Sequence, residues 1–230
     1  MNPLVSCIVP VFNGERFLGD TLDSIFAQAY RPIQVIVTDD GSTDGTANVV
    51  ASYGETIEFI RQSNRGPASA RNQGLSAANG EFIAFLDADD LWRPEKLTRQ
   101  VARLVADVSI DYSVSHVLNF WEDEVREESE HLKEHPRAQP IAGYVTGTLL
   151  ARRRIFDEIG CFNEKLAHGD ATEWFLRART EGRRGELMEE VLLLRRLHES
   201  NRSRERATKS RDEFLNILKS TLDQRRSQET

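Results

Sequence analysis

The chain has 230 residues, enough for one large domain or two small ones with a buried core. Hydrophobic residues make up 39% and charged residues 29%, which is typical of a globular protein, and a formal net charge of −7 disfavours a protein that wraps nucleic acid. Two cysteines, Cys7 and Cys161, are too few for a disulfide framework or a structural zinc cluster. With no apolar run of ~20 residues and no signal-peptide pattern, we expect a cytoplasmic protein, with peripheral attachment to the membrane left open.

The first half of the chain alternates between two hydrophobic periodicities. Short apolar runs predict buried strands at residues 4–11, 35–37, 57–60 and 82–86. Apolar residues at helical spacing predict helices at 18–29, 43–53, 67–75 and 94–105, the second of them capped by Thr43 or Asp44. This alternation, with short connections, predicts an α/β fold with a mostly parallel sheet.

The second half is less regular. Residues 112–120, 145–151 and 191–194 are strand-like, and helices are expected at 152–159, ended by Gly160, and around 174–178, ended by Gly182. Carboxylates crowd residues 122–134 together with His131, which favours a solvated acidic loop or helix face over a metal site. We therefore predict one domain at 1–203, with halves 1–108 and 109–203, and a polar helical appendage at 204–230.

Polar side chains follow three of the predicted strands: Asn13 after the first, Asp39 and Asp40 after the second, and Asp87, Asp89 and Asp90 after the fourth. Ligands of an open α/β sheet bind beyond the carboxyl ends of its strands, and a carboxylate there is costly unless it is paired. Asp87 and Asp89 lie two residues apart, so an extended chain can point both the same way, as a D-x-D pair for Mg²⁺ or Mn²⁺. Such a metal would stabilise a diphosphate leaving group.

Other phosphate-binding and hydrolase motifs are missing from the sequence. No G-x-G-x-x-G follows the first strand, and the sequence contains no G-x-x-x-x-G-K-[ST] loop, G-x-S-x-G, HExxH or CxxC. We therefore expect phosphate to be bound through a metal and an arginine.

Four ordered blocks carry a family resemblance: VSCIVPVFN at 5–13, VTDDGSTD at 37–44, NRGPASARN at 64–72 with Gly74, and FLDADD at 85–90. With weaker matches at 160–164, 169–177 and 196–198, the chain up to about Asn201 resembles the family-two glycosyltransferases. The resemblance implies the GT-A fold, a Rossmann-like, mostly parallel sheet flanked by helices. It also implies inverting transfer of a sugar from a nucleotide-diphosphate donor.

The resemblance also implies roles for individual residues. Pro10, Val11 and Phe12 would line the nucleoside pocket with Asn13, and Asp40 would accept a hydrogen bond from the base with Asp39 and Glu15 nearby. An aspartate suits a uracil N–H, so a UDP-sugar is favoured. Arg71 would approach the diphosphate, and Asp87 and Ala88 the ribose and donor sugar. Asp89, supported by Asp87, would hold Mn²⁺ or Mg²⁺. The acceptor, a saccharide, a lipid-linked saccharide or another hydroxyl compound, stays unnamed.

The general base is where the sequence departs from the family. In HGDATEW, at 168–174, the expected acid falls on Ala171, which has no proton acceptor. Asp170 takes the role after a one-residue shift, or Glu173 reaches in from the next turn, since residues three apart share a helix face. Asp170 could instead be a helix N-cap, with Glu173 completing a capping box. Trp174 is expected in the core more than at the acceptor.

Three further alternatives stay open at this point. His198 either completes the metal site or contacts the diphosphate, or it is a structural histidine. The chain as a whole is an active transferase or, since Ala171 cannot act as a base, a non-catalytic or weakly active sugar-nucleotide-binding subunit of a glycosylation assembly. A nucleotidyltransferase is disfavoured, because no basic glycine-rich phosphate loop follows the first strand. The C-terminal helix would dock on the domain, form a homodimer with a second copy or, least favoured, face a membrane.

Overall fold

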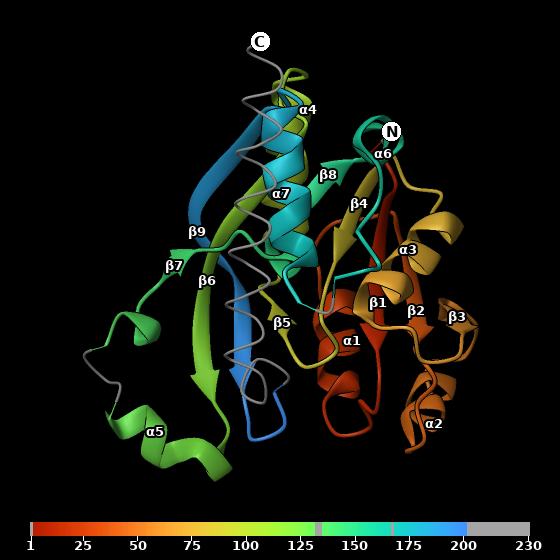
Figure 1. The fold of residues 1–230 in the computed structure, drawn as a ribbon, viewed down its shortest axis with the longest axis vertical. Coiled ribbons are helices and arrows are strands. Elements are labelled where there is room, and N and C mark those ends of the chain that lie inside the picture. The colour runs from red at the N-terminus through yellow and green to blue at the C-terminus, as the bar shows by residue number, and fades with distance from the viewer. Residues whose placement is uncertain (1, 132–134, 167, 202–230) are drawn as a thin grey trace.

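The computed structural model describes residues 2–131, 135–166 and 168–201 (Figure 1). The predicted appendage at 204–230 lies outside the described residues, so the predicted domain division stays a prediction. Within those three ranges, no helix is both long and apolar enough to cross a membrane.

The first half folds as strands and helices in alternation. They are β1 (Val5–Val11), α1 (Leu18–Phe26), β2 (Ile33–Asp39), α2 (Thr46–Ala51), β3 (Ile57–Arg61), α3 (Pro67–Ala77), β4 (Phe82–Phe85), β5 (Leu91–Trp92) and α4 (Lys96–Ala106). The four predicted strands and four predicted helices are confirmed, with shifted ends. Neither Thr43 nor Asp44 is the cap residue of α2, which is Gly45, although the Asp44 carboxylate accepts the Thr46 N–H at 3.0 Å. β5 is too short to give a periodic signal.

The second half departs further from the sequence prediction. It contains β6 (Tyr112–Trp121), α5 (Arg126–His131), β7 (Ile141–Ala142), β8 (Leu150–Arg152), α6 (Arg153–Ile159), α7 (Asp170–Thr180) and β9 (Gly185–Leu197). The strand expected at 145–151 is wrong over its first half. There Thr146–Thr148 forms a 3-10 turn, because the Thr148 hydroxyl donates to the Gly143 and Val145 carbonyls. β9 is much longer than the expected 191–194.

The strands form one sheet in the order β3-β2-β1-β4-β8-β6-β9-β5, with β7 paired to β6. β3, β2, β1 and β4 are parallel neighbours, as are β6 and β9, whereas β8 is antiparallel to both β4 and β6. β6 and β9 therefore run in the same direction as β1 and β4. Their carboxyl ends meet at one edge, the lower edge in Figure 1. This edge is the place where a parallel sheet binds its ligand.

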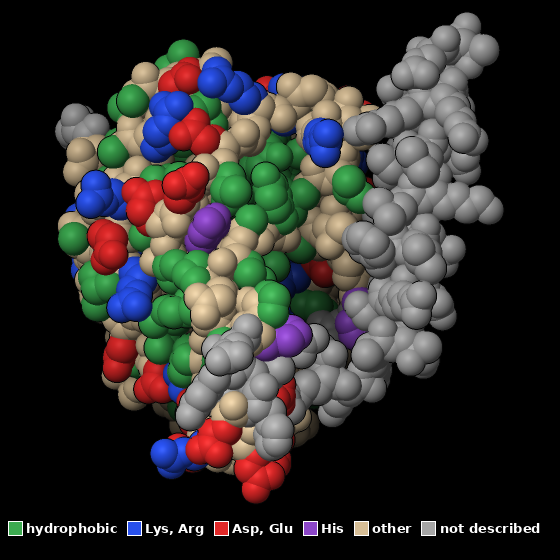
Figure 2. Space-filling view, turned by 90° about the vertical axis from the view of Figure 1, so that its left-hand side faces the viewer, with side chains coloured by type: hydrophobic (Ala, Val, Ile, Leu, Met, Phe, Trp, Pro, Cys, Tyr) green, Lys and Arg blue, Asp and Glu red, His purple; other side chains and the backbone are tan. Residues whose placement is uncertain are grey.

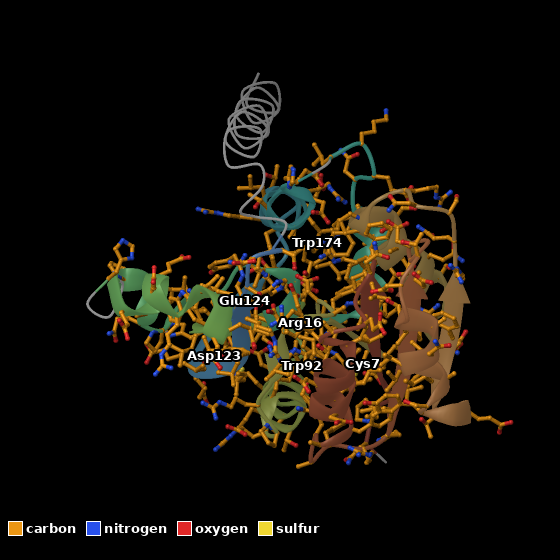
Figure 3. The ribbon with its side chains drawn as sticks, turned by 90° about the horizontal axis from the view of Figure 1, so that it is seen from below. Cys7, Arg16, Trp92, Asp123, Glu124 and Trp174 are labelled. Carbon is orange, nitrogen blue, oxygen red and sulfur yellow. The ribbon has the colours of Figure 1, made fainter. Side chains whose placement is uncertain are left out.

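Helices cover both faces of the sheet and enclose two hydrophobic clusters. One cluster contains side chains of α1, α2 and α4, and the other those of α3, α6 and α7. Figure 3, seen from below, shows Trp174 on α7 at one side of the sheet and Trp92 at the other. Trp174 has no exposed surface, which confirms its expected place in the core. Cys7 is also fully buried, and burial raises the pKa of its thiol to about 12.

A single glycine brings α3 close to the sheet. A Cβ atom on Gly74 would lie 2.4 Å from Cγ2 of Ile8, well inside van der Waals contact. Arg71 lies on the same helix, one turn before Gly74. The close approach that Gly74 permits therefore helps to bring the Arg71 side chain over the carboxyl edge.

The side of the molecule that carries β9, β7 and α5 is shown in Figure 2. Hydrophobic side chains form much of this face, and acidic and basic side chains are interspersed around them. Ile141 and Tyr144 are two large hydrophobic residues that are each more than two-fifths exposed.

Candidate active site

The loops after β1 and β2 are joined by hydrogen bonds. The Asn13 side-chain oxygen accepts the Thr43 N–H at 2.8 Å, and the Ser42 hydroxyl accepts the Asn13 N–H at 2.8 Å. The Glu15 carboxylate accepts the Gly45 N–H at 2.9 Å, at the start of α2. Asn13 has a positive φ of 52°, a conformation that asparagine tolerates better than most residues. Glu15, expected near the nucleobase, thus holds two loops together.

The aspartates at the end of β2 are bound mainly by backbone amides. Asp39 accepts the Ser42 N–H at 2.8 Å and forms an ion pair with Arg61 at 3.3 Å. Asp40 accepts the N–H groups of Arg65 and Gly66, both at 2.8 Å. Both carboxylates are buried, and these N–H groups offset the cost of burying them.

The expected nucleoside residues lie at the end of β1. Pro10 and Val11 are buried, and Phe12 is 51% exposed. An exposed aromatic ring at a sheet edge offers a flat apolar surface on which a base can stack. The assignment of these three residues and Asp40 to the nucleoside stays a prediction.

Arg71 joins two of the expected site residues. Its Nη2 donates to Asp87 Oδ1 and its Nη1 to Asp170 Oδ2, each at 2.7 Å. Arg71 and Asp170 are 6% and 7% exposed, and the third nitrogen of the guanidinium, Nε, is buried with no hydrogen-bond partner. Burial acts against the charged form of Arg71, but Asp87 and Asp170 outweigh it and raise its pKa. Two carboxylates from distant segments therefore lie on either side of one cation.

A second contact lies beside the first. His198 Nε2 is 3.1 Å from Asp89 Oδ2, which also accepts the Asn201 side-chain N–H at 3.2 Å. The His198 ring is almost fully buried and packs against Phe17, with 4.6 Å between ring centroids. Asp87 and Asp89 consequently do not share a partner, because Asp87 points to Arg71 and Asp89 to His198.

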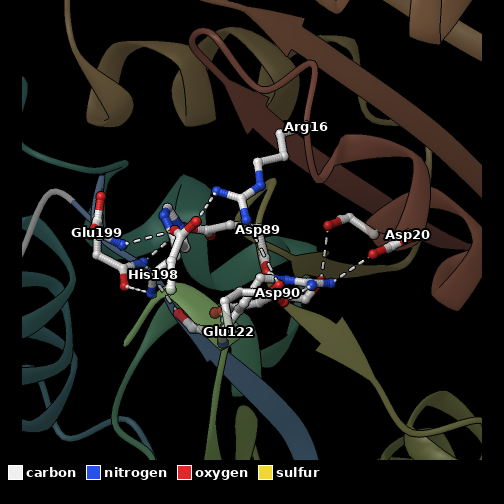
Figure 4. A network of polar contacts seen from close by, with 11 residues as sticks. Arg16, Asp20, Asp89, Asp90, Glu122, His198 and Glu199 are labelled. Atoms are coloured by element: carbon white, nitrogen blue, oxygen red, sulfur yellow. Dashed lines mark hydrogen bonds and ion pairs between the residues drawn. The ribbon is translucent and has the colours of Figure 1, made fainter. Parts of the chain in front are cut away.

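Arg196 holds this second contact in place. Its side chain donates to the Asp89 carbonyl at 2.9 Å and forms ion pairs with Asp20 and Glu122 (Figure 4). Its backbone N–H donates to Asp90 at 2.9 Å. The guanidinium also stacks over the rings of Phe17 and Phe120, 4.6 and 4.9 Å from their centroids.

The first acidic residues of the stretch 122–134 form ion pairs with Arg196 and Arg16. Glu122 and Glu124 were expected on a solvated face, but Glu122 pairs with Arg196 and Glu124 with Arg16 at 2.6 Å (Figure 4). Arg16 and Glu124 lie close to each other on the carboxyl edge in Figure 3.

Burial, together with the charges of Asp89 and Asp87, raises the pKa of Asp90 well above its usual value.

The candidate bases on α7 have different surroundings. Asp170 is the first residue of the helix and faces Arg71, whereas both oxygens of Glu173 are bound by Arg177, at 2.9 and 3.0 Å. The N-cap residue is Gly169, with no side-chain cap bond, so the capping-box alternative for Asp170 and Glu173 is wrong. Of these two acids, Asp170 is the one that Arg71 links to Asp87. Ala171 packs against the core.

The side chains at this edge can hold a divalent cation only together with oxygen atoms of a bound ligand. Within the described part of the chain, no three or more His, Cys, Asp or Glu side chains gather closely enough to hold a metal ion. The Asp89 carboxylate and the His198 imidazole are adjacent and suited to Mn²⁺, and a cation of this kind completes its coordination with substrate phosphates and water. The residues therefore fit a metal that binds with a diphosphate.

Sequence reasoning missed three residues of this site, namely Arg196, Glu122 and Asn201. The signal for Arg196 was present, since a charged pair, Arg195 and Arg196, ends an apolar strand. No pattern pointed to its partners, because Asp20 lies 176 residues away in the sequence.

Comparison with known proteins identifies relatives along most of the chain. The model of "Glycosyl transferase family 2" matches residues 6–161. An uncharacterized glycosyltransferase of Rickettsia typhi is 33% identical in an alignment of 211 residues that covers 86% of this chain and 65% of that protein. The chain spans 31% of the corresponding Rickettsia felis protein, so it is shorter than the curated relatives it matches.

Solved structures show the same fold. Staphylococcus aureus TarS 1-349, in complex with UDP-GlcNAc, has a TM-score of 0.74 at 21% identity, covering 93% of this chain and 65% of that one. The mannosyltransferase PcManGT of Pyrobaculum calidifontis, in complex with GDP-Man and Mn²⁺, has a TM-score of 0.67 at 26% identity, covering 87% and 59%. The predicted fold class, a mostly parallel sheet flanked by helices as in the GT-A structures, is confirmed.

Proposed function

The chain belongs to glycosyl transferase family 2, and we propose from this premise that it transfers a sugar from a nucleotide-diphosphate donor to an acceptor hydroxyl with inversion at the anomeric carbon. One observation carries the proposal. Arg71, Asp87 and Asp170 form one ion-paired group, and Asp89 with His198 lies beside it at the carboxyl edge. An arginine, a metal-binding carboxylate and a candidate base are the groups that this reaction needs.

The donor would lie along the carboxyl ends of β1, β2 and β4. Phe12 would stack on the base, and Asp40 would face its N–H group. Arg71 would neutralise part of the diphosphate charge, because a guanidinium binds phosphate oxygens with two N–H groups at once. A UDP-sugar is favoured. The similar proteins TarS and PcManGT are in complex with UDP-GlcNAc and GDP-Man, so both bases need testing.

Asp89 and His198 would hold the cation, which when bound stabilises the negative charge of the departing diphosphate. An imidazole ligand favours Mn²⁺ over Mg²⁺, because Mg²⁺ takes oxygen ligands almost throughout. Arg196 would act as a positioning residue, since it fixes the Asp89 carbonyl, the Asp90 carboxylate and the strand that leads to His198.

Asp170 would be the general base. The acceptor hydroxyl gives its proton to the Asp170 carboxylate, and its oxygen forms a bond to the anomeric carbon. The bond between that carbon and the diphosphate oxygen breaks with its electron pair on the diphosphate. Glu173 is a weaker candidate, because Arg177 occupies both of its oxygens.

A second candidate function is a non-catalytic sugar-nucleotide-binding subunit, residues 1–203 with the appendage at 204–230. Ala171 favours it, because the family's usual acid is missing at that position. The two candidates share a donor site and differ only in turnover.

The first experiment is calorimetric titration of UDP and GDP with and without Mn²⁺, followed by a screen for hydrolysis of nucleotide sugars. We expect Mn²⁺-dependent binding that Asp89→Ala abolishes. Asp157→Ala, an exposed carboxylate on α6, is the control and should bind as the wild type does. Unchanged metal dependence in Asp89→Ala would contradict the metal site. Binding without turnover would favour the non-catalytic subunit, and absence of binding to UDP, GDP and dTDP would overturn the proposal.

A further inference from the structure

The turn that follows β9, residues 198–201, lies beside the candidate metal site. The Asn201 side-chain oxygen accepts the His198 N–H at 2.6 Å, and the Asn201 N–H donates to the His198 carbonyl at 3.3 Å. His198 and Asn201, the two ends of the turn, are 4% and 6% exposed. Polar side chains are costly to bury unless their polar atoms have partners, so the contacts of these two residues hold the turn in place.

Asn201 also contacts the carboxylate that is expected to bind the metal. Its side-chain amide donates to Asp89 Oδ2 and to the Arg196 carbonyl, both at 3.2 Å. The Asp89 carboxylate contacts His198 as well, again through Oδ2 (Figure 4). Its other oxygen, Oδ1, accepts no hydrogen bond from the described residues, and the Asp89 side chain is 33% exposed. The protein therefore fixes one oxygen of Asp89 and leaves the other to a ligand.

His198 has a partner on each of its ring nitrogens. Nε2 is 3.1 Å from Asp89 Oδ2, and Nδ1 is 2.9 Å from the Ser200 hydroxyl. A neutral imidazole carries one ring hydrogen and a carboxylate only accepts, so Nε2 donates to Asp89 while Nδ1 accepts from Ser200. When Nε2 binds a cation, the ring hydrogen lies on Nδ1 and needs an acceptor. The Ser200 hydroxyl suits both states, because it can rotate from donating to accepting.

We propose that Ser200 and Asn201 are positioning residues of the metal site, Ser200 for the His198 ring and Asn201 for the Asp89 carboxylate. His198 and Asp89 lose their contact with each other when Nε2 binds a cation, because Nε2 then has no hydrogen to donate. One hydrogen leaves Nε2 and one joins Nδ1, so the charge of the ring does not change. Asn201 still holds Oδ2 and Ser200 still holds Nδ1, which keeps both side chains in place. This inference rests on the proposed function, since it takes Asp89 and His198 as the metal ligands.

The test measures Mn²⁺ binding to the full chain, by the electron paramagnetic resonance signal of free Mn²⁺ at a fixed high concentration of UDP or GDP. We expect Ser200→Ala and Asn201→Ala each to weaken Mn²⁺ binding about 10- to 100-fold, the usual loss when the outer partner of a metal ligand is removed. Ser200→Thr keeps the hydroxyl and should restore the wild-type affinity. In a His198→Ala background, Ser200→Ala should cost no further affinity, because Ser200 acts only through the His198 ring.

Two controls separate positioning from a general effect on the fold. Ser109→Ala is a matched control, since the Ser109 hydroxyl also bonds a neighbouring side chain, Asp107, but lies just before β6, at the opposite end of that strand from the site. It should leave Mn²⁺ affinity unchanged. Thermal unfolding of each variant checks that it folds, and Asn201→Ser replaces Asn201→Ala if the alanine variant does not.

Wild-type Mn²⁺ affinity in Ser200→Ala or in Asn201→Ala would overturn the role given to that residue. A loss in Ser200→Ala that is equal with and without His198, or that Ser200→Thr does not restore, would mean that Ser200 acts on the fold and not on the ring. Unchanged Mn²⁺ affinity in His198→Ala would remove His198 from the ligands, and the role of Ser200 with it. In each case the wild type still binds Mn²⁺ and nucleotide, so the proposed function stands. A wild type that binds neither UDP nor GDP at any Mn²⁺ concentration would remove both.

Discussion

The two ends of the carboxyl edge hold their acidic residues in different ways. On the nucleoside side, Asp39 and Asp40 are bound mainly by backbone N–H groups, those of Ser42, Arg65 and Gly66. The side chains of Arg61 and Gln62 add one contact to each aspartate. On the metal and base side, side chains bind Asp89 and Asp170, the partners being His198 and Arg71. The first kind of contact spans 3 to 26 residues of sequence, and the second 99 to 109.

The difference has a physical consequence. A backbone donor is present whichever side chain the loop carries, so the nucleoside side is determined by loop shape. The Arg71 guanidinium is itself a buried charge, and its loss would leave the Asp170 carboxylate unpaired. Substitutions on the metal and base side should therefore cost more than substitutions on the nucleoside side, and three of the following four predictions test this ranking.

The largest expected effect is on the base. Asp170→Asn should lower the rate of glycosyl transfer about 10²- to 10⁴-fold, because the acceptor proton then has no carboxylate to accept it. Nucleotide binding should not weaken. The measurement is transfer rate at saturating donor, with Ala171→Asp as the companion variant. An unchanged rate in Ala171→Asp supports Asp170, whereas a large gain would mean that the base is missing from this chain.

Removal of Arg196 comes next. Arg196→Met keeps the apolar contacts with Phe17 and Phe120 but removes the ion pairs with Asp20 and Glu122 and the hydrogen bond to the Asp89 carbonyl. Glu122 keeps Arg16 at 3.9 Å and Asp20 is exposed, so we expect a loss of about 2 kcal/mol in the free energy of unfolding. Mn²⁺-dependent nucleotide binding should weaken with it. Denaturant unfolding gives the first quantity. Arg103→Met, which breaks a half-exposed pair with Glu186, should cost far less. Equal losses in the two variants would contradict the ranking.

A third prediction concerns a buried cation away from the edge. Lys96 has no exposed surface, bonds Gln100 at 2.6 Å and lies over the Trp92 ring, and burial lowers its pKa to about 7 from 10.5. The folded protein therefore binds fewer protons than the unfolded chain between these values. The free energy of unfolding should rise with pH in that window, by up to about 1.4 kcal/mol per pH unit.

Comparison of wild type with Lys96→Met isolates this contribution. The free energy of unfolding is measured at pH 7.5 and pH 8.5, inside the window from about 7 to 10.5. It should rise with pH in the wild type, and the variant should lack this slope. The difference between the two proteins removes contributions of other groups, such as Cys7 and Tyr53, whose pKa values are raised to about 12. Parallel slopes would mean that Lys96 stays charged in the folded protein.

The smallest effect is expected on the nucleoside side. Glu15→Gln keeps an oxygen for the Gly45 N–H at the start of α2 and removes only the charge, so the free energy of unfolding should fall by about 1 kcal/mol or less. Thermal unfolding measures it, with Glu55→Gln in the exposed turn before β3 as the control. A loss as large as that of Arg196→Met would break the distinction between the two ends of the edge.

The sequence predicted the elements of the first half well because their signals are local. Apolar runs gave β1 to β4, and Pro67 marked the first residue of α3. It missed β5, which has two residues, and it predicted less of the second half, where β7 also has two residues and the stretch before β8 is a turn closed by the Thr148 hydroxyl. Short strands and side-chain-closed turns carry no hydrophobic period.

The candidate site divides in the same way. Local motifs identified the acidic residues after β1, β2 and β4, and the resemblance assigned them to a donor site. The sequence offered Asp170 as the base with Glu173 as the alternative, since residues three apart share a helix face. The structure distinguishes them by their partners, Arg71 for Asp170 and Arg177 for Glu173. The sequence placed Asp87 and Asp89 together, whereas the fold gives them separate partners.

By itself, the sequence determined the family, the order of strands and helices in the first half, and which acidic residues follow each strand. These depend on neighbours within a few residues, where periodicity and loop motifs act. Only the tertiary structure decided that Arg71 joins Asp87 to Asp170 and that Arg196 joins Asp89 to Asp20 and Glu122. Such pairs form because the folded sheet brings distant charges to one water-poor edge, where each must find an opposite charge.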